Sequence, residues 1–187
     1  HRYEVALANR ARYGAVMAYF ASMADPALRV RPIHRLVGHR PAVAPGVRQV
    51  APPPPFGEGQ AGAGLDALRP TCSVQRVSSL SALTRWLEGN TPGRFGCAVH
   101  GGLYRVAVLA GRLAHWLKEP SVPASVAGLD VSLLHGLVFP ALGIEESYLA
   151  YTTDAGGALA SVEAQASRMA WLMRGIPIDR VYTIASQ

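Results

Sequence analysis

Two His-Arg pairs carry residue types suited to holding an anion. His1 and Arg2 open the chain directly before a helical pattern. His34 and Arg35 follow an extended stretch. A helix start presents unpaired backbone N–H groups, and an arginine fork matches the geometry of phosphate. Glu4 could balance Arg2 or orient a ligand, although a first-turn Glu is favourable without any function. Each pair also has a plainer interpretation, as solvated side chains with no ligand.

The other histidines give no pattern that indicates catalysis or metal binding. They show no HxxxH or HExxH spacing, and no Walker loop, GxSxG elbow or GxGxxG fingerprint is present. His135 lies on an apolar helical pattern and is interpreted as a packed, hydrogen-bonded histidine. The sequence therefore predicts no metal site and identifies no catalytic residue.

The net positive charge of the chain lies in its first part. The 187 residues carry a formal net charge of +6. Residues 1 to 50 hold eight Arg against Glu4 and Asp25, whereas the basic and acidic residues of 51 to 187 cancel. A localised basic surface favours phosphates, nucleic acid or an acidic partner, or it is simply solvated.

The composition indicates a globular chain, because half of the residues are hydrophobic and 16% are charged. The longest apolar run, 132–144, is too short to cross a bilayer, so no membrane partner is expected. Cys72 and Cys97 lack a CxxC partner and are interpreted as a reduced pair in the cytoplasm. The sequence leaves the oligomeric state open.

Two elements are expected before residue 38. Apolar residues recur at helical spacing over 2–24, and the Asp25-Pro26 step ends that helix. Residues 28–37 follow as an extended segment, and Pro32 indicates an edge strand or a broken one. Residues 38–70 are rich in Pro and Gly and are interpreted as a linker or a surface excursion.

From residue 71 the pattern alternates between short strands and helices. The predicted elements are strands at 74–77, 95–100, 103–109, 148–151 and 168–173, and helices opened by Ser79, Asp130, Asp154 and Pro177. Gly101-Gly102 marks a hairpin, and Gly143 ends the helix over 131–142. The predicted fold is α/β or α+β, a mixed sheet with an antiparallel hairpin and flanking helices. Three parts follow: 1–37, the linker 38–70, and an α/β portion over 71–187.

Several segments together resemble a known family. HRYEVAL at 1–7 is similar to the end of the Asp-Gly-His-His-Arg-Tyr-Glu-Thr-Ala-Leu signature of domain of unknown function 1015. Residues 28–37 resemble that family's Pro-Thr-His-Arg-Leu segment, and LDVSLLH at 129–135 also fits. Val5 and Ile33 stand where the family has Thr.

The resemblance implies a fold and an activity. The signature is itself similar to the phosphate-binding boxes of ParB-like proteins and sulfiredoxins, a group that includes free-serine kinases. It implies an incomplete ParB/sulfiredoxin-like core joined to a second α/β portion. The implied reaction is phosphoryl transfer from ATP or ADP, with Mg²⁺, to free serine or a similar small hydroxy amino acid.

The resemblance also implies a role for the first His-Arg pair. His1 and Arg2 would hold nucleotide phosphates, the main task in such transfer. By their own chemistry Glu4, His34 and Arg35 are possible contacts for phosphate or substrate. The alternative is a ParB-like module that binds nucleotide or nucleic acid without catalysis. Nucleic acid is the less favoured partner, because no helix-turn-helix pattern is present.

The family signature's Asp-Gly-His and its later Met-Pro-x-Lys-Ser-Thr segment do not occur in the chain. We therefore expect an internal fragment of a longer protein, inactive and prone to aggregate by itself. In that interpretation 28–37 is an unpaired edge strand.

Overall fold

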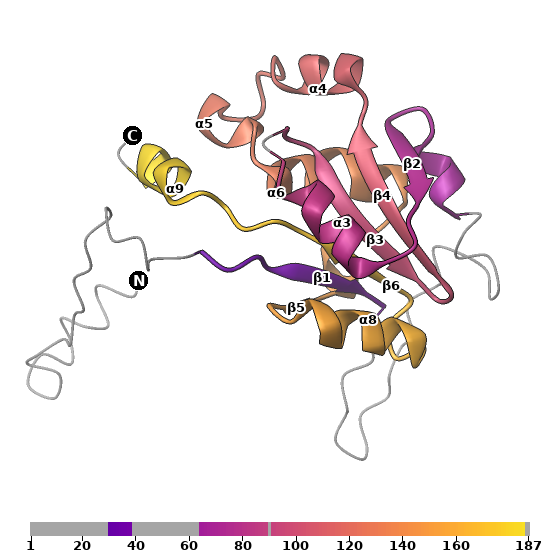
Figure 1. Ribbon diagram of the computed structural model, residues 1–187. Coiled ribbons are helices and arrows are strands. Elements are labelled where there is room, and N and C mark those ends of the chain that lie inside the picture. The colour runs from indigo at the N-terminus through magenta and orange to yellow at the C-terminus, as the bar shows by residue number, and fades with distance from the viewer. Residues whose placement is uncertain (1–29, 39–63, 90, 186–187) are drawn as a thin grey trace, which may run out of the picture.

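A computed structural model describes residues 30–38, 64–89 and 91–185. His1, Arg2 and Glu4, the helix expected over 2–24 and most of the Pro-rich segment lie outside these residues. Within them the protein forms an α+β fold, built on a single six-stranded sheet with helices on both faces (Figure 1). The α+β class with an antiparallel hairpin and flanking helices is confirmed.

The strands run in the order β2-β4-β3-β6-β1-β5, and every neighbouring pair is antiparallel. Their bounds are β1 (His34–Val37), β2 (Cys72–Arg76), β3 (Arg94–Val99), β4 (Gly102–Val108), β5 (Leu149–Thr152) and β6 (Met169–Leu172). β3 and β4 form the hairpin expected at Gly101-Gly102, and Gly101 has a positive φ of 70°.

β1 lies inside the sheet, between β6 and β5. The expectation of an edge strand at 28–37 is therefore wrong, and the exposed edge inferred from it does not exist. The strand begins at His34, two residues after Pro32, so the missing N–H of the proline falls outside the ladder. Within the described residues, β1 and the strands of 71–187 share one sheet.

Helices cover both faces of the sheet. Their bounds are η1 (Leu65–Leu68), α3 (Leu80–Leu87), α4 (Ala110–Trp116), α5 (Ala124–Ala127), α6 (Asp130–Leu133), η2 (Leu134–Val138), α7 (Phe139–Ala141), η3 (Glu146–Tyr148), α8 (Ala155–Glu163) and α9 (Ile178–Ala185). α3 and α8 pack on one face, against Ala98, Ala170 and Leu172. The continuous α6-η2-α7 stretch packs on the other, against Phe95 and Trp171.

Strand alternation explains why each face has its own core. Successive side chains of a strand point to opposite faces. In β6, Met169 and Trp171 belong to the larger core, whereas Ala170 and Leu172 belong to the smaller one. Small residues on the second face let α3 approach closely: a Cβ on Gly96 would lie 2.6 Å from Leu83 Cδ2. The larger core sits under α6-η2-α7, next to Arg35.

Local signals placed most helix ends correctly. Ser79 caps α3, and its hydroxyl accepts a hydrogen bond from Ala82 N–H at 3.2 Å. Gly143 has a positive φ of 64°, as a residue that ends a helix often does. The last part of the expected linker instead forms η1, in which Leu65 and Leu68 are buried in the larger core.

Asp130 is not the helix cap that the sequence indicated. Leu129 occupies the cap position, and Asp130 lies in the first turn of α6. Its carboxylate instead accepts hydrogen bonds from Gly93 N–H at 2.7 Å and from the Arg174 guanidinium. The side chain therefore joins α6 to the segments before β3 and after β6.

No helix within 30–38, 64–89 and 91–185 has the length and apolar character needed to span a bilayer.

Candidate functional site

Arg35 is a buried arginine on an interior strand of the sheet, with 8% of its surface exposed. It lies on β1 between β6 and β5, opposite Trp171 on one side and Tyr151 on the other. Its side chain points to the same face as Val37, the face covered by α6-η2-α7. Burying a guanidinium costs free energy unless its donors are bonded.

The contacts of Arg35 involve no acidic group among the described residues. Its Nε donates to His135 Nε2 at 3.4 Å, and one Nη1 hydrogen goes to the Ile33 carbonyl. Its guanidinium carbon lies 5.6 Å from the centre of the Tyr151 ring. Burial lowers the pKa of Arg35, and the Tyr151 phenol opposes that shift. The poor solvation of Arg35 and the lack of an acidic partner within the described part of the chain both favour an anion next to its guanidinium.

Arg35 lines a cavity of about 610 Å³, a volume typical of small-molecule sites. Its walls come from residues 30–33 before β1, 128–131 around the start of α6, and 173–180 from the end of β6 into α9. In Figure 1 the chain before β1 and the chain leading to α9 leave the sheet on the same side. Residues distant in sequence therefore enclose the cavity.

The cavity is cationic with partly apolar walls. Its charged residues are Arg31, Arg35, Arg174 and Arg180 against Asp130 and Asp179. Apolar side chains such as Ile33, Leu129 and Met173 contribute the walls. Such a lining suits a ligand that joins an anionic group to a less polar body.

Asp130 and Arg174 form an ion pair on the wall of this cavity. Arg174 Nε lies 2.5 Å from Asp130 Oδ2, and the two side chains are 21% and 8% exposed. Arg174 Nη1 also donates to the Gly89 carbonyl at 2.5 Å. The pair neutralises Arg174, so Arg35 is the buried cation left for a ligand among the described residues.

His34 and Arg35 do not act side by side. They are consecutive in β1, so their side chains lie on opposite faces of the sheet. His34 is 4% exposed, and its Nδ1 accepts a hydrogen bond from Met173 N–H at 3.1 Å. Burial, then the charge of Arg35, lowers the pKa of His34, and Asp154 opposes them. His34 thus fixes the strand next to the site.

His135 is the residue that sequence reasoning left out of the site. It lies in the π-helical turn η2, and such turns are frequent at functional sites. Its ring packs on Phe139 with centroids 4.9 Å apart. Burial, then Arg35, lowers the pKa of His135, whereas Glu146 raises it. The apolar pattern of 129–135 predicted that His135 lies on a helix, but it did not indicate that Arg35 is its hydrogen-bond partner.

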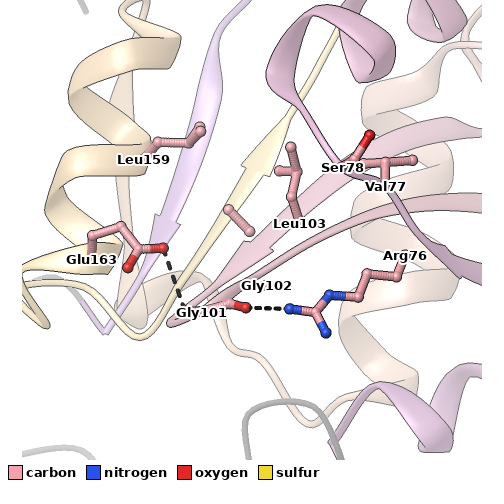
Figure 2. A pocket seen from close by; sticks show the side chains of 9 residues that line it. Arg76, Val77, Ser78, Gly101, Gly102, Leu103, Leu159 and Glu163 are labelled. Carbon is pink, nitrogen blue, oxygen red and sulfur yellow. Dashed lines mark hydrogen bonds between the residues drawn. The ribbon is translucent and has the colours of Figure 1, made fainter.

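A second cavity, of about 580 Å³, offers less chemistry (Figure 2). Figure 2 shows Arg76 and Glu163 reaching the Gly101-Gly102 turn from opposite sides. Arg76 donates to the Gly101 carbonyl at 2.7 Å, and Glu163 accepts from Gly101 N–H at 3.3 Å. Both charges thus serve to hold the hairpin turn.

Among residues 30–38, 64–89 and 91–185, no three His, Cys, Asp or Glu side chains are arranged to hold a metal ion. Cys72 and Cys97 are buried as free thiols in the larger core.

Comparison with known proteins gives no relative: no family model, no curated protein and no solved structure matches this chain.

Proposed function

We propose that the chain is part of an ATP- or ADP-dependent phosphotransferase that acts on free serine or a similar small hydroxy amino acid. One structural observation supports the anion-binding part of this proposal. Arg35 is a buried guanidinium without an acidic partner among the described residues, and it faces a cationic cavity of about 610 Å³. The identity of the substrate rests on the resemblance to domain of unknown function 1015.

In this proposal Arg35 binds a phosphate group. Phosphoryl transfer depends on positioning and on neutralising the charge of the phosphate oxygens, and a preorganised arginine fork does both. Exposed Arg31 and Arg180 on the cavity rim would attract the nucleotide. The Mg²⁺ implied by the resemblance would arrive on the nucleotide. The proposal places the reaction in the cytoplasm.

Binding of ADP to the 187-residue chain tests the anion site. We expect Arg35→Gln to weaken binding by at least about tenfold, because a hydrogen bond to a charged group contributes about 1.5–3 kcal/mol. Arg85→Gln is the matched control, since Arg85 is exposed on α3 on the other face of the sheet. Calorimetric titration gives both affinities. Equal ADP affinity of Arg35→Gln and wild type would refute the site.

Formation of phosphoserine tests the reaction. The intact gene product, given serine, Mg²⁺ and ATP or ADP, should yield phosphoserine detectable by mass spectrometry. Nucleotide binding that depends on Arg35 without phosphoserine would favour the alternative, a nucleotide-binding module without catalysis.

A further inference from the structure

Arg35 makes its longest-range side-chain hydrogen bond with His135. The two residues are 100 positions apart, and Arg35 Nε donates to His135 Nε2 at 3.4 Å. A neutral imidazole accepts at one nitrogen only. Because Nε2 accepts here, the proton of the neutral ring belongs on Nδ1.

The remaining donors of Arg35 are those that a ligand can reach. One Nη1 hydrogen bonds the Ile33 carbonyl and the Nε hydrogen bonds His135, which leaves the Nη2 hydrogens and the second Nη1 hydrogen. Arg35 lines the cavity of about 610 Å³, and His135 does not. An anion in the cavity therefore meets Arg35 on the side away from His135.

The surroundings of His135 hold its ring in place. Phe139, one turn later, packs on the imidazole, and Phe139 in turn packs on Trp171 of β6 at 6.0 Å between centroids. In the part of the chain that the structure describes, the charged groups that act on His135 are Arg35 on β1 and Glu146 on η3, and Tyr151 on β5 lies against Arg35. A fixed acceptor can orient a flexible arginine, which otherwise loses rotamer freedom when it binds.

We propose that neutral His135 is a positioning residue, which accepts the Nε hydrogen of Arg35 and thereby aims the guanidinium at an anion in the cavity. This inference rests on the proposed anion site at Arg35.

Protonation of His135 would undo this arrangement. A protonated ring carries N–H donors at both nitrogens, so Nε2 no longer accepts from Arg35 and two positive charges face each other. Burial and Arg35 lower the pKa of His135 from its usual value near 6.5, which keeps the ring neutral at pH 7. Anion affinity at Arg35 should thus fall as the pH falls toward this lowered pKa.

Sulfate is a suitable probe, because it stays a dianion over the whole pH range of interest. The full chain and its variants are titrated with sulfate at pH 7.5 and pH 5.5, and thermal melting checks that each is folded. Wild type should bind sulfate more weakly at pH 5.5 than at pH 7.5, by up to about tenfold, the size expected for one hydrogen bond to a charged group. His135→Gln retains an acceptor but does not titrate, so it should bind sulfate at both pH values.

His135→Phe keeps a ring without an acceptor and should bind weakly at both pH values. Equal affinity of His135→Phe and wild type at pH 7.5 would overturn the proposal. So would wild-type binding that strengthens at pH 5.5, because His135 would then contact the anion directly. If His135→Phe does not fold, the sulfate affinities of wild type and His135→Gln at the two pH values still test the proposal. An equal loss of affinity in both proteins at pH 5.5 would show that His135 is not the group whose protonation weakens binding. Arg35→Gln separates the two ideas: sulfate binding that survives it refutes the anion site itself.

Discussion

The Asp130 carboxylate lies 2.5 Å from Nε of Arg174 and ties the first turn of α6 to the segment that follows β6. Asp130 also accepts from the backbone N–H of Gly93, directly before β3. One carboxylate thus joins three chain segments beside the candidate site. Its removal should affect both the stability of the protein and ligand binding in the cavity.

Asp130→Asn should lower the free energy of unfolding by about 3 kcal/mol. Removing one partner of a largely buried pair leaves the other charge uncompensated. Urea denaturation at pH 7 measures the change. Asp66→Asn is the control: Asp66 pairs with Arg69 at 2.8 Å, but both side chains are mostly exposed. That substitution should cost less than about 1 kcal/mol. Equal costs for the two substitutions would contradict the structural role of Asp130.

Gly136→Ala should destabilise the protein by about 1–3 kcal/mol, the range for overpacking a filled core. A Cβ at Gly136, in η2, would overlap the Trp116 ring, which its hydrogen bond to the Ala127 carbonyl holds at 2.9 Å. Gly111→Ala, on α4, is the matched control because nothing lies within 4 Å of its Cβ position. That change should stabilise by about 0.5–1 kcal/mol. A shift of both melting temperatures in the same direction would speak against the packing at Trp116.

Stability should fall as the pH drops below about 6.5 toward the lowered pKa of His34. The pKa of His34 is lowered chiefly by burial, so near pH 6.5 the unfolded chain binds protons that the folded chain does not. The contribution of neutral His34 is complete above pH 6.5 and is lost as the pH falls toward its lowered folded pKa. His135 acts in the same direction.

His34→Asn tests this pH dependence, because it keeps an acceptor near the position of Nδ1 but does not titrate. Urea midpoints between pH 5 and 8 should vary less steeply for the variant than for wild type. Identical slopes would show that His34 titrates alike in the folded and unfolded chains.

Neither cysteine should react with a thiol reagent in the folded protein. Burial raises the pKa of Cys72 to about 12 and also raises that of Cys97, whereas the reactive species is the thiolate. Ellman's reagent at pH 8 should detect both thiols only after denaturation. Rapid reaction of Cys72 in the native state would indicate that η1, which packs on β2, opens readily.

The sequence by itself determined the elements whose signals are local. Ser79 predicted the start of α3 because its hydroxyl accepts a hydrogen bond from a backbone N–H group in the first turn of the helix. Gly101-Gly102 predicted the β3–β4 hairpin because glycine adopts a positive φ without strain. The helix end predicted at Gly143 was correct for the same reason, since Gly143 also has a positive φ. These features depend on a few neighbouring residues, so their physics is contained in a short stretch of chain.

The tertiary structure alone decided which strands are neighbours and which side chains meet. Pro32 suggested an edge, yet β1 is an interior strand, because strand order depends on pairing with β5 and β6 from the far end of the chain. Asp130 had the position of a cap, but its partner Arg174 lies 44 residues away. The sequence made Arg35 a candidate hydrogen-bond donor to an anion, but it did not indicate the contact with His135, which lies 100 residues away. Such contacts arise when the two faces of the sheet pack, and no local pattern records them.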